Sequence, residues 1–331
     1  MKPFAYTRAT NLDTAIQTVG RDQTAKFIAG GTNLLDLMKE NVEQPDRLVD
    51  ITRLELARIE DRSGGLRLGA LARNSDTANH PLVRQRYPLI SQAILAGASP
   101  QLRNAATNGG NLLQRTRCYY FYDTAMPCNK REPGTGCGAL EGYNRIHAIL
   151  GTSPQCIATH PSDMAVALAA LEAVIQVEGP QGERSIPIAE FHRLPGNTPQ
   201  IDTNLRKGEL ITAIDLPATS AVFARRSTYL KLRDRASYAF ALVSVAAALD
   251  IQNGTIRQAR VAMGGVAHKP WRAVEAERIL TGARATEAIF RQAAEATMRE
   301  ARGYEYNRFK IEMGKRAIVR ALMTVAEMVG R

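Results

Sequence analysis

The sequence predicts an α+β protein in which two α/β subdomains are followed by a C-terminal domain of antiparallel sheet and helices. Short apolar segments bounded by glycine occur together with segments of helical spacing up to about residue 222. A run of strand-like segments then contains Asn253–Gly254, a strong hairpin signal. From Val274 the apolar spacing is helical to the end. The chain of 331 residues is long enough for two or three such domains.

The first unit, residues 1–58, has the order strand, loop, helix. Ala25–Gly30 is apolar and ends in glycine, as expected for a short strand. The sequence GGTN follows, and Leu34–Glu40 then places leucine and methionine at helical spacing. Thr32 or Asn33 is in position to cap this helix. A further strand, RLVDI, belongs to the same small α/β subdomain.

The second unit, residues 59–222, contains an inserted loop at about residues 115–157. A strand and a helical region precede the insertion, whereas a helix, a hairpin and a closing strand follow it. The hairpin is expected to turn at Gly179–Gly182. The expected elements are, in order, LRLGALAR, PLISQAILAGAS, the helix Met164–Val174, IQVEGPQGERSIPI and ELITAIDLP.

The third unit, residues 224–331, begins with strands and ends with helices. Strands are expected in TYLKL, in the apolar stretch Tyr238–Leu249 and in TIRQARVAMGGV. Because Asn253–Gly254 lies between the last two, they are expected to pair as an antiparallel hairpin.

The net charge of +11 favours an acidic partner, which could be nucleic acid, an anionic cofactor or an acidic protein subunit. A solvated basic surface is the alternative, since basic residues are spread along the chain. The segment MKPFAYTRAT lacks the apolar core of a secretory signal. The longest apolar run, Tyr238–Leu249, is shorter than the roughly 20 residues that span a bilayer. We therefore expect no membrane span and no self-export, although a partner could carry the chain.

Two glycine pairs are candidates for phosphate binding. Gly30–Gly31 follows a strand and precedes a helix, and Gly109–Gly110 lies in the similar sequence TNGGN. Main-chain N–H groups in such turns point inward and attract anions, and two such turns suit a ligand with two phosphates. Turns need glycine for conformational reasons as well, so either pair alone is a weak signal. The chain has no G-x-x-x-x-G-K-[ST] phosphate loop, and a dinucleotide-binding βαβ motif is disfavoured.

All four cysteines lie in one stretch, at Cys118, Cys128, Cys137 and Cys156. The intervening segments of nine, eight and eighteen residues do not match zinc fingers, zinc ribbons or ferredoxin runs. Four thiolates are nevertheless the number that holds an iron–sulfur cluster. Four inert, reduced cysteines are the alternative that the spacing leaves open.

Four cations flank these cysteines in the sequence. We expect their positive charge to favour thiolate over thiol. They are Arg115, Arg117, Lys130 and Arg131.

Several motifs resemble the FAD-binding subunit of the xanthine dehydrogenase and molybdenum hydroxylase family, over essentially the whole chain. They are KFIAGGTNLLDLMK, TNGGNLLQRTRC, THPSDMAVAL, SYAFALVSVAA and GGVAHKPWR. The likeness is greatest to the flavin and [4Fe–4S] subunit of bacterial molybdenum-dependent aldehyde oxidoreductases. The resemblance implies an FAD-binding domain of the PCMH type, followed by a domain like the C-terminal domain of the CO dehydrogenase flavoprotein.

The resemblance also implies residue roles. The first glycine segment would line the FAD, with residues 29–33 around its pyrophosphate; its residues are Lys26, Phe27, Ile28, Ala29, Gly30, Gly31, Thr32, Asn33 and Leu34. Thr107, Gly110 and Asn111 would form a second wall. Asp163 would bind the sugar-like chain or ring edge, and Lys231 would lie near the isoalloxazine. Cys118, Cys128, Cys137 and Cys156 would ligate the [4Fe–4S] cluster.

For several of these residues a purely structural role is the alternative interpretation. Asp163 opens a helix, where an acidic residue commonly just caps. Lys231 could face solvent from its strand. Tyr238 and Phe240 could stack on a ring or pack in the core.

The resemblance implies an electron-transfer subunit without a catalytic residue for aldehyde oxidation. A partner subunit would hold the molybdenum cofactor and oxidise an aldehyde, and another would carry [2Fe–2S] clusters. Electrons would reach FAD here and leave to an external acceptor, in an assembly expected to be a heterotrimer. The chain would be cytoplasmic, or periplasmic if exported with a signal-bearing partner.

Two other functions stay open from the residues alone. The first is a nucleic-acid-binding protein with a structural cluster or zinc, since Tyr119–Tyr122 lies among basic residues. The second is a stand-alone flavoenzyme. The resemblance implies neither, and we expect no nucleic-acid partner.

Overall fold

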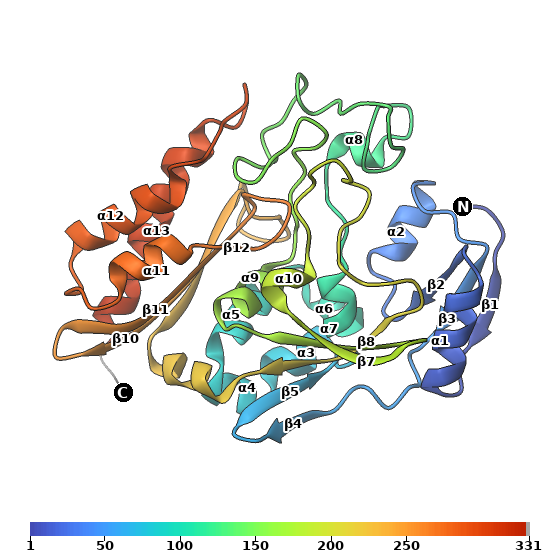
Figure 1. Cartoon of the computed structure of the whole chain (residues 1–331), viewed down its shortest axis with the longest axis horizontal. Helices are drawn as coiled ribbons and strands as arrows, with labels where there is room; N and C mark the ends of the chain where they lie inside the picture. Colours follow the sequence, from blue (N-terminus) through green and yellow to red (C-terminus); the bar gives the residue numbers. More distant parts are fainter. Residues whose placement is uncertain (329–331) are drawn as a thin grey trace.

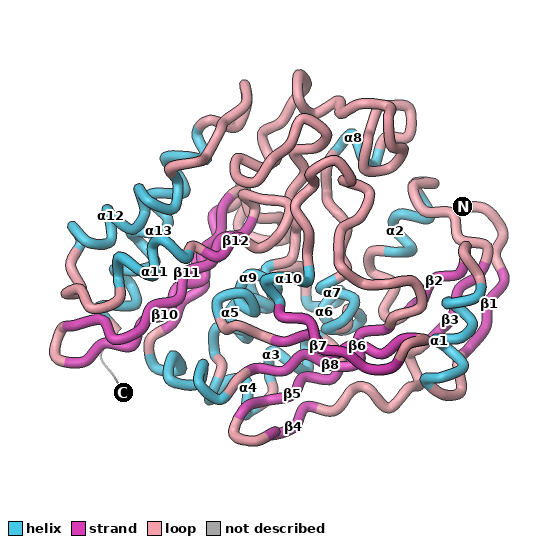
Figure 2. Tube along the Cα trace, in the orientation of Figure 1, coloured by secondary structure: helices cyan, strands magenta, loops and turns pink. Residues whose placement is uncertain are grey.

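The computed structural model describes residues 1–328, which form three β-sheets with helices packed around them (Figure 1). The sheets follow one another along the chain. Between α7 and α9 the chain is almost entirely loop, as Figure 2 shows. None of the helices in residues 1–328 is both long and apolar enough to cross a membrane.

The first sheet is parallel, with strand order β1-β3-β2. Its elements are β1 (Ala5–Arg8), α1 (Leu12–Arg21), β2 (Ala25–Ile28), α2 (Leu34–Lys39) and β3 (Arg47–Asp50). Asn11 caps α1 by accepting a hydrogen bond from Thr14 N at 2.8 Å. Ile16 and Val19 of α1 are buried in one cluster with Val49 of β3. The expected order of strand, glycine turn and helix is confirmed.

The second sheet is antiparallel and has five strands in the order β4-β5-β8-β6-β7. They are β4 (Ile59–Arg62), β5 (Gly65–Gly69), β6 (Val174–Gly179), β7 (Gly182–Pro187) and β8 (Leu210–Leu216). The strand that comes last in the sequence, β8, lies at the centre of the sheet between β5 and β6. It therefore joins the segments before and after the long insertion. The predicted hairpin at Gly179–Gly182 is confirmed by the pairing of β6 with β7.

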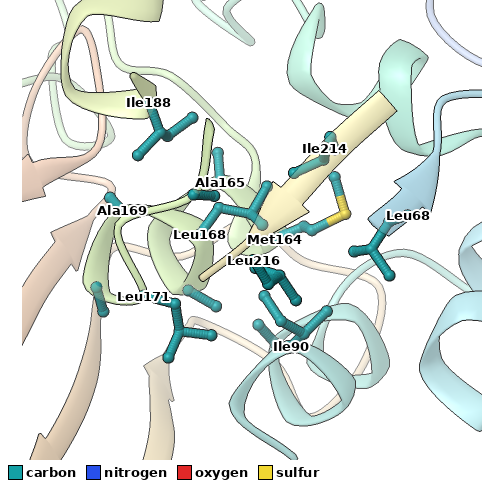
Figure 3. Close-up of a cluster of buried hydrophobic side chains, with 14 of the residues drawn as sticks. Leu68, Ile90, Met164, Ala165, Leu168, Ala169, Leu171, Ile188, Ile214 and Leu216 are labelled. Atoms are coloured by element: carbon teal, nitrogen blue, oxygen red, sulfur yellow. The ribbon is translucent and has the colours of Figure 1, made fainter. Parts of the chain in front are cut away.

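The helices of this part of the chain are short, and α9 lies at the centre of the core. They are α3 (Asn74–Asn79), α4 (Pro81–Arg86), α5 (Pro88–Ala96), α6 (Pro100–Ala105), α7 (Asn108–Leu112), α8 (Tyr119–Tyr122), α9 (Asp163–Ala170), α10 (Ile188–Phe191) and the 3₁₀ helix η1 (Ala218–Arg225). Figure 3 shows Met164 and Leu168 of α9 near Ile90 of α5 and Ile214 of β8. The helix ends earlier than the expected Val174, because Glu172 has φ = +57° and Val174 begins β6.

The third sheet is antiparallel, in the order β12-β11-β10-β9. Its strands and helices are β9 (Ser227–Leu232), β10 (Val243–Gln252), β11 (Thr255–Gly264), β12 (Trp271–Arg272), α11 (Val274–Leu280), α12 (Glu287–Met298) and α13 (Phe309–Glu327). Asn253 and Gly254 have φ of 52° and 76°, so the predicted hairpin turn is confirmed.

The alternation along β10 explains its apolar stretch, because both of its faces are buried. Val243, Val245 and Leu249 belong to the cluster that contains α13, whereas Ala246 and Ala248 belong to the cluster that contains α9. The two alanines thus face α9, whereas the larger residues face the C-terminal helices together with Ala247. This strand joins the third domain to the second.

Candidate functional site

The turn between β2 and α2 carries unengaged main-chain donors. Within residues 1–328, the N–H groups of Gly30, Gly31 and Thr32 donate to no protein acceptor. Gly31 has φ = +70°, a left-handed conformation that favours glycine. Successive free amides in such a turn form a concave anion-binding site. The first glycine pair therefore has the geometry expected of a phosphate site.

Gly30 and Asn33 make contacts with distant segments that were not expected. A Cβ at Gly30 would lie 1.9 Å from the carbonyl oxygen of Ala105, so this glycine allows the turn to pack against α6 rather than against a ligand. Asn33 precedes α2 but makes no side-chain cap. Its Oδ1 instead accepts a hydrogen bond from Arg115 N at 2.9 Å. Neither interaction could be read from the local sequence.

The second glycine pair does not form the expected anion-binding turn. Gly109 and Gly110 lie inside the short helix α7, and both of their amides are engaged. Gly109 N donates to the carbonyl oxygen of Ala70 at 2.8 Å, and Gly110 N donates to Thr107 Oγ1 at 3.3 Å. The prediction that amides of both pairs bind a diphosphate is therefore wrong for the second pair. Thr107 and Gly110 still face the cavity described next.

A cavity of about 440 Å³ opens between these segments, a volume typical of cofactor sites. The β2–α2 segment forms one wall, α7 and the end of β5 form another, and the loop before β8 forms a third. Eleven of the fourteen predicted cofactor-binding residues line it. These are Lys26, Phe27, Ile28, Ala29, Gly30, Gly31, Thr32, Asn33, Leu34, Thr107 and Gly110.

The third wall, residues 205–211, escaped the sequence analysis. It brings Arg206 and Lys207 to the cavity, and Arg115 adds a third cation from another loop. Lys207 Nζ donates to the carbonyl oxygens of Gln23 and Ala25, both at 3.2 Å. Burial and the nearby Lys26 lower the pKa of Lys207. The only sequence signal for this wall is the basic pair Arg206–Lys207, which is followed by Gly208.

Glu209 of the same wall is not free to act as a base. Arg184 holds it through two hydrogen bonds of 2.7 Å, one to each carboxylate oxygen. Arg206 N donates to it at 2.7 Å as well. Although burial raises the pKa of Glu209, these donors lower it below the ordinary value. The loop is thereby fixed, and the cavity keeps its excess of cations.

Three predicted cofactor residues lie outside the cavity lining: Asn111, Asp163 and Lys231. Lys231 Nζ lies 2.8 Å from Asp163 Oδ2, and the side chains are 4% and 9% exposed. Lys231 therefore does not face solvent. The cap of α9 is Ser162, whose Oγ accepts from Ala165 N at 3.0 Å, so Asp163 serves as the partner of Lys231. Ser162 also hydrogen-bonds Asn111, which connects this pair to α7.

The aromatic candidates are surface residues. Tyr238 and Phe240 are 58% and 48% exposed, so neither packs in the core. Phe240 lies under the guanidinium of Arg117, 5.1 Å from its ring centroid. Tyr119–Tyr122 forms α8, in which Phe121 is fully buried and Tyr122 is held by Arg117 and Asp36. The run therefore does not present a continuous aromatic surface.

The four cysteines converge although their sequence spacing is wide. Cys118, Cys128, Cys137 and Cys156 line one small cavity, and three of them are at most 6% exposed. All four are free thiols. The enclosed space is about 10 Å³, which is room for about one water molecule. Within residues 1–328, no three histidine, cysteine or acidic side chains are close enough to hold a single metal ion. The four donors thus suit an iron–sulfur cluster in kind.

Polar contacts hold the loops of this cysteine cavity together. Asn129 Oδ1 accepts hydrogen bonds from Gly134 N and Gly136 N at 3.0 and 2.9 Å. Its Nδ2 donates to the side chain of Gln155 at 2.9 Å. His147 Nε2 lies 3.1 Å from Cys118 Sγ. Residues 128–137 are thereby tied to the segment that carries the last cysteine.

The expected stabilisation of thiolates is not found. Burial raises the pKa of the Cys118 and Cys137 thiols, and it raises that of Cys156 to about 11 although Lys130 opposes the shift. Desolvation outweighs the cations because these are engaged elsewhere. Arg117 pairs with Asp36 at 2.7 Å, and Arg131 donates to main-chain carbonyls. A bound metal would therefore have to displace the thiol protons.

Comparison with known families gives two adjacent matches that cover most of the chain. Residues 2–219 match the FAD binding domain in molybdopterin dehydrogenase. Residues 227–323 match the CO dehydrogenase flavoprotein C-terminal domain. The expected fold is confirmed by these matches and by the structural likeness below.

Individual relatives agree with the family matches. The chain is 52% identical to the aldehyde oxidoreductase FAD-binding subunit of Escherichia coli K12, over 97% of this chain and 98% of that one. It is 30% identical to the glyceraldehyde dehydrogenase medium chain of Sulfolobus acidocaldarius, over 88% and 85%. A chain of the carbon monoxide dehydrogenase of Hydrogenophaga pseudoflava superposes with a TM-score of 0.76 at 26% identity, over 98% of this chain and 97% of that one.

Proposed function

The chain belongs to the FAD-binding subunits of the molybdenum hydroxylase family, and from this premise we propose that it transfers electrons within an aldehyde oxidoreductase complex. It is a subunit of a molybdenum–flavin oxidoreductase whose catalytic part lies in another subunit. The proposal is carried by the cavity of about 440 Å³ at the β2–α2 turn. The relative of 52% identity makes aldehydes the proposed substrates of the complex.

The side chains and amides of this cavity fit FAD. The free amides of Gly30, Gly31 and Thr32 would bind the pyrophosphate. Arg206 and Lys207 balance its charge from the opposite wall. Bound FAD would supply the redox chemistry that the side chains lack.

The flavin end is assigned through the resemblance. The buried pair Asp163–Lys231 would lie near the ring, reached through Asn111 at the end of α7. A fixed ammonium at that place favours added negative charge on the ring system. The pair lies outside the cavity lining, so this contact is a proposal independent of the pyrophosphate site.

We further propose that Cys118, Cys128, Cys137 and Cys156 bind a [4Fe–4S] cluster. The support is the convergence of four buried thiols on one cavity. Four cysteine ligands are the usual set for such a cluster. The chain's part is to exclude water and to hold the loops by Asn129.

The proposed partners are a molybdenum-cofactor subunit that oxidises the aldehyde and a [2Fe–2S] subunit that delivers electrons, in a heterotrimer. The electrons would leave from this chain to an external acceptor. Within this scheme the chain binds and orients the flavin and excludes water. It takes no part in aldehyde binding.

Visible spectroscopy with cofactor counting on the purified chain and complex tests the proposal. We expect flavin bands with a broad iron–sulfur shoulder, about one FAD released by acid and about four irons per chain. A colourless chain with full zinc occupancy would overturn both assignments. Flavin without iron would overturn the cluster alone.

A further inference from the structure

The two candidate cofactor sites share a wall. Leu37 of α2 is 1% exposed, lines the flavin cavity, and belongs to the same buried cluster as Cys118 and Cys128. The turn before α2 supplies the free amides, and Leu37 within the helix packs against the cysteine segment. A displacement of α2 would therefore change both sites at once.

Five charged side chains run from one site to the other, and we call them the ion-pair chain. In order they are Lys26, Glu43, Arg115, Asp202 and Lys130. The first three line the flavin cavity, and the last lines the cysteine cavity. Lys130 is buried, with 1% of its side chain exposed. The sequence places only Arg115 and Lys130 together, beside the cysteines. The five residues come from four separate loops and one strand.

Arg115 is the central member, since it alone contacts two carboxylates. Its NH1 donates to Glu43 Oε1 at 2.6 Å, and its Nε lies 2.6 Å from Asp202 Oδ2. The second contact is an ion pair without aligned hydrogen-bond geometry. The rigid guanidinium fork suits this bridging role better than an ammonium would.

Arg115 is also anchored to both sites by other contacts. Its main-chain N–H donates to Asn33 at the start of α2, at 2.9 Å. Its guanidinium lies 4.9 Å from the ring centroid of Phe121, three residues after the first cysteine. One residue thus touches the turn of the flavin cavity and the helix that follows Cys118.

We propose that Arg115 is a positioning residue that holds the flavin cavity and the cysteine cavity in register and couples their electrostatics through Glu43 and Asp202. The inference rests on the proposed function, because it requires a redox group in each cavity. Arg115 acts through the ion-pair chain, since its polar contacts are with Glu43, Asp202 and Asn33. The ion-pair chain holds three cations and two carboxylates. Loss of Asp202 therefore leaves the buried Lys130 without a carboxylate partner in the chain, whereas loss of Arg115 divides the chain into two separate pairs, Lys26–Glu43 and Asp202–Lys130.

The test measures the midpoint potentials of flavin and cluster in the holo-complex, for two substitutions of opposite charge effect. Arg115→Gln removes a positive charge between the sites and should lower both potentials, because reduction adds negative charge. Asp202→Asn removes a negative charge and should raise both. Arg115→Lys should restore the potentials while FAD still dissociates about tenfold faster than from wild type, since lysine cannot bridge both carboxylates.

Arg67→Gln is the matched control. Arg67 has nearly the same exposure as Arg115, pairs with Asp215 outside the ion-pair chain, and lines neither cavity. It should leave the flavin potential unchanged. Shifts of the same sign for Arg115→Gln and Asp202→Asn, or a shift confined to one cofactor, would overturn the coupling. A wild-type complex without iron would overturn both the cluster and the coupling. Counting iron and FAD per chain would reveal that result before any potential is measured.

Discussion

Lys231 and Asp163 form a buried ion pair that joins the C-terminal sheet to helix α9, with 2.8 Å between Nζ and Oδ2. Tyr229 donates to the other carboxylate oxygen at 2.6 Å. Lys231 Nζ also donates to the carbonyl oxygen of Ala96 at 3.1 Å, at the end of α5. Burial and the carboxylate raise the pKa of Tyr229 well above its usual value, so its phenol stays a donor. The pair therefore fixes three elements at one point.

Asp163→Asn should destabilise the protein by about 3 kcal/mol, because it leaves the ammonium of Lys231 buried without a counter-charge. Urea denaturation at pH 7 measures the loss. The double variant Asp163→Asn/Lys231→Met should recover a substantial part of it, since no charge then remains. Equal losses for the single and double variants would show that the pair is not coupled.

Gly30→Ala should destabilise the β2–α2 turn and abolish FAD retention. A Cβ at this position would meet the carbonyl oxygen of Ala105 at 1.9 Å, and a main-chain atom cannot move aside as a flexible side chain can. Gly182→Ala is the control, because Gly182 has φ = +93° but nothing within 4 Å of the added Cβ. It should cost about 1–2 kcal/mol of conformational strain and leave FAD bound. Acid-released FAD per chain is the readout, and full FAD in Gly30→Ala would contradict the assignment.

These two sites show what the sequence could and could not predict. The turn at Gly30–Gly31 was predictable because its strand, glycines and helix are contiguous. The same reasoning failed at Gly109–Gly110, where the amide acceptor is Ala70, a residue brought there by the sheet. Patterns among neighbouring residues in the sequence carry no information about a hydrogen-bond acceptor that is distant in the sequence.

Contacts between loops are the second feature that the sequence could not predict. The convergence of the four cysteines was suggested only by their number, because their spacing matches no compact motif. The pKa values of the thiols are raised, whereas the neighbouring cations predicted lower values. The sequence shows these cations but shows neither their carboxylate partners nor the burial of the thiols. The wall at residues 205–211 has only the basic pair Arg206–Lys207 as a sequence signal, and its position depends on the central place of β8 in the sheet.

Cys128→Ser should lose iron while keeping FAD, because the thiol lines the cysteine cavity and is absent from the flavin cavity. A serine hydroxyl is a poor ligand for an iron–sulfur cluster compared with a thiolate. Met126→Ala is the control within the same loop, since Met126 is 37% exposed and carries no thiol. Iron and flavin per chain are counted for both variants. Unchanged iron in Cys128→Ser would remove this residue from the ligand set.

Lys310 should make stability rise with pH above neutrality. Its side chain is fully buried and donates to the carbonyl oxygen of His147 at 2.7 Å and to that of Gly265. Burial, aided by the positive charge of Arg145, lowers the pKa of Lys310 from 10.5 to about 7. Between these two pH values the unfolded chain binds a proton that the folded chain does not. Stability therefore increases with pH across this window.

The effect is at most about 4–5 kcal/mol, from 1.36 kcal/mol per pKa unit. Urea denaturation from pH 7 to pH 9.5 should show this rise in wild type and a flatter profile in Lys310→Met. Lys315→Met is the control, because Lys315 lies on the same helix with its ammonium paired to Glu295 at the surface. Parallel profiles for wild type and Lys310→Met would mean that the buried ammonium keeps its charge in the folded protein, held by the two carbonyl oxygens.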